Sequence, residues 1–170
     1  PLGMSVIAAA LQRAGHTVRQ FDLLANGFSL DALRAVAAAE TPALFGVSFR
    51  NLDNVNACNE ALYIDRLARL VAELRTMGDA PVVLGGPGFS VLPEQVMAAT
   101  GADYGIVGEG ESLIVELAGV LARGGRPAQR ILRSPSALAP GEMSPPAYDH
   151  RILSFYLQAG SLAPLQTKRG

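Results

Sequence analysis

The 170-residue sequence contains no tryptophan and a single cysteine, Cys58. One cysteine excludes an internal disulfide and a cysteine-ligated metal cluster within these residues. Neither histidine lies in a context that suggests a general base, so we expect Cys58 to be a small core or helix-start residue rather than a nucleophile. Apolar runs fall far short of the ~20 residues of a membrane span, and no signal-peptide pattern is present. We therefore expect a soluble, cytoplasmic protein without a membrane partner.

Charge is scarce as well. Charged residues make up 17% of the sequence, and the net charge is -1. A nucleic-acid partner is therefore not expected, because binding to nucleic acid needs a strongly basic surface. Hydrophobic residues make up 49% of the sequence, which predicts a packed core. The length suits one domain with some chain left over.

The sequence does contain a regular alternation of strands and helices. It predicts a doubly wound α/β fold, flavodoxin-like or Rossmann-like, with a parallel sheet and helices on both faces. Strands are predicted over 16–24, 43–48, 81–84 and 104–107, the last three as buried apolar runs. Helices are predicted over 1–14, 30–40, 59–77, 93–100 and 113–123. Because a helix opens the chain with no strand before it, we expect the first strand of the sheet to be missing from this fragment.

The pattern changes after Gly125. Residues 134–146 are rich in proline, serine and glycine, which predicts a connecting segment, and His150 is assigned to the same linker. One more strand is predicted over 162–167. We therefore divide the chain into an α/β domain over 1–130 and a linker with a first strand over 131–170. The second part would lead into a further domain that is not in this chain.

Glycines cluster at the end of one predicted strand. The apolar run Val82 to Leu84 is followed by Gly85, Gly86 and Gly88. Ligands of open α/β sheets bind at the carboxyl ends of the strands, and backbone without side chains lets a large, flat molecule come close. The alternative is a strand-to-helix turn that needs positive φ. Three glycines in four residues favour a ligand site.

Three segments are expected to meet at this edge, because parallel strands all end on the same side of a sheet. We call them the edge segments. The first comprises Ser48, Phe49, Arg50, Asn51, Leu52 and Asp53; the second comprises Gly85, Gly86, Pro87 and Gly88; the third comprises Val107, Gly108, Glu109 and Gly110. Backbone N–H groups, helix N-termini, one guanidinium and several hydroxyl and amide groups would suit a large, polar-fringed, partly anionic cofactor.

A dinucleotide suits the edge segments less well. The fingerprint G-x-G-x-x-G needs a third glycine, but Gly86-Pro-Gly88 is followed by Val91, and Gly108-Glu-Gly110 by Leu113. The sequence also has no Walker A lysine. A flavodoxin-like module that binds a nucleotide, or nothing, stays open as an alternative.

Five motifs in order carry a family resemblance. They are Pro1-Leu-Gly3 opening a helix, Ala14-Gly-His16 closing it, Gly85-Gly-Pro87, Val107-Gly-Glu-Gly-Glu111 and Thr167-Lys-Arg-Gly170. The combination resembles the N-terminal cobalamin-binding domain of cobalamin-dependent radical SAM methyltransferases, over nearly the whole chain. The resemblance implies cobalamin as the cofactor of this domain. It also implies S-adenosylmethionine and a [4Fe-4S] cluster in a downstream domain, where a cysteine triplet would follow the Arg-Gly ending.

The resemblance also implies roles for the edge segments. Ser48 would lie near the nucleotide tail of cobalamin, and the second and third segments would line the corrin and its tail. Carriers of the methionine synthase type ligate cobalt with the histidine of D-x-H-x-x-G. On this chain that histidine would stand just before Pro1, and neither His16 nor His150 has the motif around it. No metal ligand is therefore expected from this chain.

Arg50 is the residue that we place at the lower face of cobalt, in a tuning role. A guanidinium has no free lone pair with which to coordinate a metal. It would instead discourage a sixth ligand and so ease methyl transfer. The alternative is a salt bridge between Arg50 and Asp53 inside the first edge segment, and both could hold.

The resemblance implies methyl transfer from S-adenosylmethionine via methylcobalamin to an unactivated carbon or phosphorus centre of a small molecule or peptide. The Arg50-Asn51 loop also resembles that of tryptophan 2-C-methyltransferases, which would make C2 of tryptophan the acceptor. The domain alone would be non-catalytic, with the downstream radical SAM domain and the substrate as its partners. A stand-alone corrinoid carrier or sensor is the alternative from a non-enzyme class.

Overall fold

The computed structural model describes residues 2–53, 62–134, 145–160, 162 and 164. The chain divides into two compact units. The first unit joins residues 1–40 to residues 139–170, and the second comprises residues 41–138. In the part of the chain that the structure describes, no helix is both long and apolar enough to cross a membrane.

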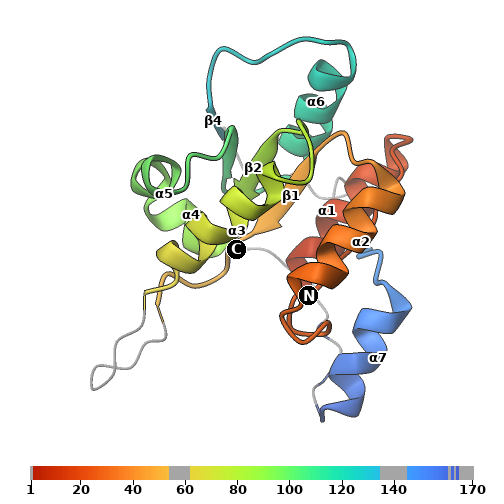
Figure 1. Ribbon diagram of the computed structural model, residues 1–170. Coiled ribbons are helices and arrows are strands. Elements are labelled where there is room, and N and C mark those ends of the chain that lie inside the picture. The colour runs from red at the N-terminus through yellow and green to blue at the C-terminus, as the bar shows by residue number, and fades with distance from the viewer. Residues whose placement is uncertain (1, 54–61, 135–144, 161, 163, 165–170) are drawn as a thin grey trace. The chain divides into compact units, whose positions relative to one another are not determined.

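The second unit contains the sheet (Figure 1). Its described strands are β1 Phe45–Ser48, β2 Val82–Gly85, β3 Tyr104–Val107 and β4 Ile131–Arg133. All neighbouring strands pair in parallel, in the order β1-β2-β3-β4. The predicted α/β class with a parallel sheet is therefore confirmed.

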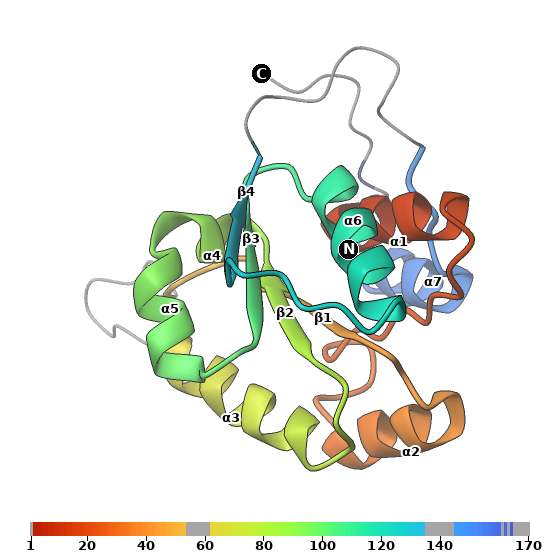
Figure 2. The ribbon, with the colours of Figure 1, turned by 90° about the horizontal axis from the view of Figure 1, so that it is seen from above.

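Helices of the second unit cover both faces of this sheet. The described helices are α3 Ile64–Arg75, α4 Pro87–Val91, α5 Pro93–Thr100 and α6 Glu111–Ala122. α3 packs against α5, and Figure 2 shows α5 and α6 on opposite faces of the sheet. This arrangement is the one that the alternation of strands and helices predicts.

Apolar side chains from the sheet and the helices form the core of the second unit. Val82 and Leu84 of β2 are completely buried. Leu67, Val71 and Leu74 of α3 are also buried, at the three- and four-residue spacing that predicts an amphipathic helix in the sequence. The hydrophobic pattern thus determines which face of α3 is covered.

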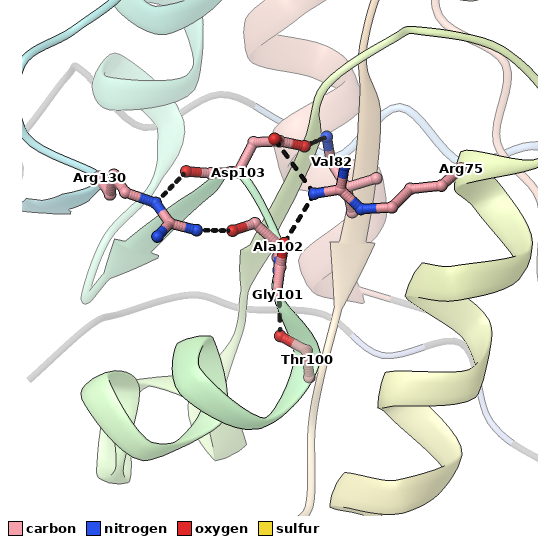
Figure 3. A network of polar contacts seen from close by, with 7 residues as sticks. All are labelled: Arg75, Val82, Thr100, Gly101, Ala102, Asp103 and Arg130. Atoms are coloured by element: carbon pink, nitrogen blue, oxygen red, sulfur yellow. Dashed lines mark hydrogen bonds and ion pairs between the residues drawn. The ribbon is translucent and has the colours of Figure 1, made fainter.

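A polar network joins the elements at the amino-terminal edge of the sheet (Figure 3). The Asp103 carboxylate accepts a hydrogen bond from the Val82 N–H (2.8 Å) and pairs with Arg75 at 3.2 Å. Arg75 also donates to the Gly101 carbonyl (2.6 Å), and Arg130 donates to the Asp103 carbonyl (3.2 Å). The network fixes α3 and the starts of β2, β3 and β4 to one another, at the edge opposite the three edge segments.

The first unit contains the helices α1 Leu2–Arg13, α2 Leu30–Glu40 and α7 His150–Gln158. The Asp149 carboxylate caps α7, because it accepts hydrogen bonds from the N–H groups of Arg151 (2.9 Å) and Ile152 (3.4 Å). At the start of α2 the Ser29 hydroxyl accepts from the Ala32 N–H (3.1 Å). This bond satisfies an N–H group in the first turn of the helix, as an N-cap serine does.

The predicted strand over 16–24 is wrong, because among the described residues this segment pairs with no strand. Two of its polar residues instead bond to residues far along the chain. The Gln20 side chain donates to the Ala147 carbonyl (2.6 Å), and Asp22 accepts a hydrogen bond from the Tyr156 hydroxyl (3.0 Å). The alternating polarity therefore reflects side chains that bond to the region around α7, and not one face of a strand.

β1 is shorter and less buried than predicted. The prediction gives a buried strand over 43–48, whereas β1 covers Phe45–Ser48 and its residues alternate between half-buried and exposed. β1 lies at one edge of the described sheet, so strand β2 is its neighbour on one side. An edge strand presents more of its surface to solvent than the fully apolar run suggests.

Two helices begin at other residues than predicted. α3 begins at Ile64 rather than near 59, because Leu62 pairs with Asp53 in an isolated antiparallel bridge. α6 begins at Glu111 rather than 113. Residues 54–61, which include Cys58, lie outside the described part of the chain.

Two elements of the structure, β4 and α7, are missing from the sequence prediction. β4, Ile131–Arg133, lies in the segment that the sequence assigns to the linker, and it pairs with β3. α7 begins at His150, so the assignment of His150 to a linker is wrong. The predicted strand over 162–167 lies outside the described residues except for Leu162 and Pro164, neither of which is in a strand. Most of the predicted connecting segment also lies outside them.

Candidate functional site

The carboxyl ends of β1 and β2 bring the first two edge segments together. Ser48 and Gly85 are partners at the last paired position of these strands. The Phe49 N–H donates to the Gly85 carbonyl (2.7 Å). The Phe49 carbonyl accepts hydrogen bonds from the N–H groups of Gly88 (3.0 Å) and Phe89 (3.4 Å). Backbone hydrogen bonds therefore hold the two segments side by side.

Two glycines of the second edge segment are required by the protein's own backbone. Gly86 has φ +97°, and a β-carbon there would lie 2.8 Å from the Phe49 carbonyl oxygen. A β-carbon at Gly88 would lie 2.9 Å from the Arg50 carbonyl oxygen. At Gly85 the nearest atom, a carbonyl oxygen of β3, would be 3.7 Å away, which is an ordinary contact. Packing against the first edge segment thus accounts for Gly86 and Gly88 being glycines, whereas it does not account for Gly85.

The second edge segment is also more helical than predicted. α4 begins at Pro87 with Gly86 as its N-cap, so Pro87 and Gly88 are helical residues. Proline at the first helical position is the sequence signal for this start. Phe89 is completely buried, and a β-carbon on Gly105 of β3 would come within 2.1 Å of its ring. α4 thereby packs against β3 as well as against the first edge segment.

The third edge segment follows β3 and contacts the second through one side chain. Gly108 has φ +82°, and Gly110 is the N-cap residue of α6. The Gly108 N–H donates to the Ser90 hydroxyl (3.1 Å), which itself donates to the Gly86 carbonyl (3.1 Å). Ser90 is absent from the predicted site residues. The sequence feature that could have identified Ser90 is a serine that directly follows Phe89 and stands four residues after Gly86.

Exposure differs among the predicted site residues. The exposed ones are Ser48, Arg50, Asn51, Pro87 and Gly108; the half-buried ones are Leu52, Asp53, Gly85, Gly86, Val107, Glu109 and Gly110; the buried ones are Phe49 and Gly88. Phe49, at 8% exposure, belongs to the core. The surface of the edge is thus formed mainly by small or polar residues.

Arg50 is exposed and takes part in no ion pair with any described residue. The alternative salt bridge between Arg50 and Asp53 is therefore not formed. Asp53 pairs instead with Leu62 in the isolated backbone bridge, and the Tyr63 N–H donates to the Leu52 carbonyl (2.8 Å). These contacts fix the end of the first edge segment to the start of α3 and leave the Arg50 guanidinium facing solvent.

Two cavities lie away from the edge segments. One of about 140 Å³ is in the first unit, where Arg19 and Arg151 are among its lining residues. The other, of about 230 Å³, is lined by residues of α6 and β4 that include Leu117 and Leu132. Neither cavity is lined by a residue of the edge segments, so neither coincides with the predicted site.

The chemistry of the edge suits a large organic cofactor. It offers backbone N–H groups, the Ser48 hydroxyl, the Asn51 amide and the Arg50 guanidinium beside a strand end without side chains. Within the described residues, no group of three or more His, Cys, Asp and Glu side chains could hold a metal ion. An open parallel α/β sheet with such a carboxyl edge is typical of the Rossmann-like class of cofactor-binding domains.

Comparison with known proteins identifies the family. The B12 binding domain family matches residues 1–118, and the chain belongs to this family. It is 38% identical over 161 residues to the tryptophan 2-C-methyltransferase of Streptomyces laurentii. That match covers 89% of this chain and 26% of the relative, so the chain spans about a quarter of the relative's length.

Solved structures of a second relative are similar to this chain. They are two structures of the radical S-adenosylmethionine methyltransferase TsrM from Kitasatospora setae, one with tryptophan and the analogue aza-SAM and one with cobalamin and a [4Fe-4S] cluster. Both match with a TM-score of 0.69 and 33% identity over 74% of this chain, and over 23% and 24% of their own chains. The family resemblance that the sequence motifs predict is therefore confirmed.

Proposed function

We propose that this chain is the cobalamin-binding domain of a radical S-adenosylmethionine methyltransferase. Membership of the B12 binding domain family supports the cofactor. The identity of 38% to a tryptophan 2-C-methyltransferase and the likeness to TsrM support the reaction class. The methyl group would come from S-adenosylmethionine and go to an unactivated carbon or phosphorus centre of a small molecule or peptide. C2 of tryptophan is the first acceptor to test.

The carboxyl edge of the sheet is the proposed cobalamin site, and Gly85 is the observation that carries it. The fold does not need a glycine there, since a β-carbon would find its nearest neighbour at 3.7 Å. A strand end without side chains lets a flat macrocycle approach the backbone. Ser48, beside Gly85 in the strand register, would lie near the nucleotide tail. The other proposed contacts are Phe49, Arg50, Asn51, Leu52, Asp53, Gly86, Pro87, Gly88, Val107, Gly108, Glu109 and Gly110.

Cobalamin, when bound, supplies a cobalt centre that accepts a methyl group and passes it to the substrate. We assign Arg50 to the lower face of that centre. Its guanidinium is exposed and has no ion-pair partner among the described residues. Because a guanidinium cannot coordinate a metal, Arg50 would keep other ligands away and favour release of the methyl group. The protein would thus contribute a fixed positive charge and no metal ligand.

The remaining chemistry belongs outside these residues. We propose that residues 1–130 form the cobalamin-binding domain and that residues 131–170 lead to a downstream radical SAM domain. The pairing of β4 with β3 moves the end of the sheet to Arg133. S-adenosylmethionine and the [4Fe-4S] cluster would bind in the downstream domain, which is the proposed partner, and the whole enzyme would work in the cytoplasm.

Purification of the complete polypeptide with hydroxocobalamin tests the cofactor assignment. After desalting, the visible spectrum should retain corrin absorbance, and we expect cobalamin to bind in its base-off form. Complete loss of corrin absorbance on desalting would contradict the proposal. The acceptor is tested separately with methyl-labelled S-adenosylmethionine and tryptophan, where label should appear at C2. If corrin is retained but no labelled product forms, the cofactor assignment is supported and tryptophan is excluded as the acceptor.

A further inference from the structure

Ser90 links two edge segments that the sheet itself does not hold together. β2 and β3 are in register at two pairs only, Val83 with Tyr104 and Leu84 with Gly105. The β2–β3 ladder therefore ends before the second and third edge segments, although Gly85 still pairs with Ser48 and Val107 with Arg133. Because no β2–β3 pair joins these two segments to each other, a direct contact between them must come from outside that ladder.

The Ser90 hydroxyl supplies that contact. It accepts a hydrogen bond from the Gly108 N–H (3.1 Å) and donates one to the Gly86 carbonyl (3.1 Å). Because an N–H can only donate, Gly108 fixes the hydroxyl as acceptor on that side, and its single proton is used toward Gly86. One side chain thus joins the two glycines, both of which have positive φ.

The helix that carries Ser90 is itself firmly placed. Phe89, the preceding residue, is completely buried beside Gly105 of β3. The Gly88 N–H donates to the Phe49 carbonyl (3.0 Å) of the first edge segment. The hydroxyl of Ser90 therefore stands on a short element that is anchored on both sides, and from there it reaches the Gly108 segment.

We infer that Ser90 is a positioning residue of the cobalamin site, holding the third edge segment against the second so that both present their backbone to the cofactor. This inference rests on the proposed function. Without the hydroxyl, the Gly108 N–H would lose its protein acceptor and the third segment would move relative to Gly86. Cobalamin would then have to order that segment on binding, which weakens the affinity.

The test compares Ser90→Ala and Ser90→Thr in the complete polypeptide, titrated with hydroxocobalamin. Threonine keeps the hydroxyl and alanine removes it. We expect Ser90→Ala to raise the dissociation constant by about five- to tenfold, the range for one net hydrogen bond, and Ser90→Thr to stay within about twofold of the unaltered protein. Ser112→Ala, at an exposed serine of α6, is the matched control and should bind normally.

A second readout needs no cofactor. Amide hydrogen exchange at Gly108 should be faster in cobalamin-free Ser90→Ala than in Ser90→Thr or the unaltered protein, while exchange in β2 stays unchanged. A destabilised fold would instead speed exchange throughout the second unit. Unchanged exchange at Gly108 in Ser90→Ala would overturn the inference without any binding measurement.

The outcomes separate this inference from the function on which it rests. If the unaltered protein does not retain hydroxocobalamin, the proposed function fails. If it does, and Ser90→Ala binds as tightly, the inference fails while the function stands. Equal weakening in Ser90→Ala and Ser90→Thr would also overturn it, because the hydroxyl would then not be the cause.

Discussion

Gly88 lies directly against the backbone of Arg50, such that a β-carbon on Gly88 would stand 2.9 Å from the Arg50 carbonyl carbon and oxygen. A β-carbon essentially never comes this close to another heavy atom that is not bonded to it. The position of the Arg50 segment is thus set by the absence of a side chain on α4. Arg50, which we propose to tune cobalt, is therefore mechanically coupled to Gly88 through the protein backbone.

Gly88→Ala should therefore displace the first edge segment. In most helices this substitution is favourable, but here we expect a loss of about 1–3 kcal/mol in the free energy of unfolding from overpacking. Hydroxocobalamin affinity should fall as well, because the backbone of the first edge segment moves. Urea unfolding and the corrin titration measure the two effects.

Gly119→Ala is the matched control for that prediction. Gly119 also lies within a helix, α6, and a β-carbon there would meet only the Arg123 side chain end, at 3.4 Å. The arginine can move aside, so this change should stabilise the protein by up to about 1 kcal/mol. If Gly88→Ala gains stability as Gly119→Ala does, a β-carbon fits beside the Arg50 backbone and the predicted overpacking is excluded.

Asp103→Ala should destabilise the second unit without affecting cobalamin binding. The Val82 N–H would lose its acceptor, and Arg75 would lose its partner, at a cost of about 1–3 kcal/mol. Asp103→Asn should cost less, because an amide oxygen can still accept from Val82 and the exposed pair with Arg75 contributes only about 0.2–1 kcal/mol.

Glu94→Gln serves as the control for Asp103, since Glu94 and Arg133 form an exposed ion pair in the same unit. It should change the unfolding free energy little. Because the Asp103 network lies at the amino-terminal edge, hydroxocobalamin affinity should be equal in all three variants. A large loss of affinity in Asp103→Asn would mean that the two edges of the sheet are coupled.

The sequence predicts the parallel class, β2, β3 and most helices, because continuous apolar runs and glycine C-caps are local signals. Gly101, at φ +66° after α5, is one such cap. The sequence does not reveal why residues 86 and 88 are glycines, because their close neighbours, Phe49 and Arg50, follow a different strand. Contacts between segments that are distant in sequence leave no periodic pattern.

Other misses have equally physical causes. β4 covers three residues, too few for a recognisable strand pattern. The segment 16–24 has alternating polarity, but a strand exists only where another strand pairs with it. α7 is different, because Asp149 followed by an amphipathic run is a local N-cap signal, and it lies in a region whose prolines favour a linker interpretation.

Asp149 predicts a pH dependence for the first unit. Burial raises the pKa of its carboxyl, but hydrogen bonds from the Arg151 and Ile152 N–H groups, and then the Arg151 side chain and its charge, outweigh burial. The pKa is therefore below its ordinary value. Ionised Asp149 therefore stabilises the folded state at pH values above its unfolded pKa of about 3.9. This contribution is lost as the pH falls through the lower pKa of the folded state.

Asp149→Asn tests this dependence, because asparagine still caps a helix but does not titrate. At pH 6 the unaltered protein should be the more stable, and the difference should shrink as pH falls below about 4. Amide exchange in α7 at several pH values measures it. A difference that stays constant over this range would show that ionised Asp149 adds nothing beyond the cap.

Arg50→Ala and Arg50→Lys should both bind hydroxocobalamin and yet transfer methyl groups more slowly. We expect a rate loss of about tenfold or more, equivalent to about 1.4 kcal/mol, because lysine does not reproduce the planar, strongly basic guanidinium. Arg69→Ala, at an exposed arginine of α3, is the control. Unchanged rates in both Arg50 variants would exclude Arg50 from tuning the reaction.

The location of the cofactor is the central claim, and amide hydrogen exchange with and without hydroxocobalamin tests it most directly. In the complete polypeptide, binding should slow exchange in peptides covering 48–53, 85–90 and 107–110. Peptides covering 100–103 at the opposite edge, and 19–26 beside the cavity of the first unit, should be unaffected. Protection confined to 100–103 or 19–26, with the three edge segments unchanged, would contradict the account.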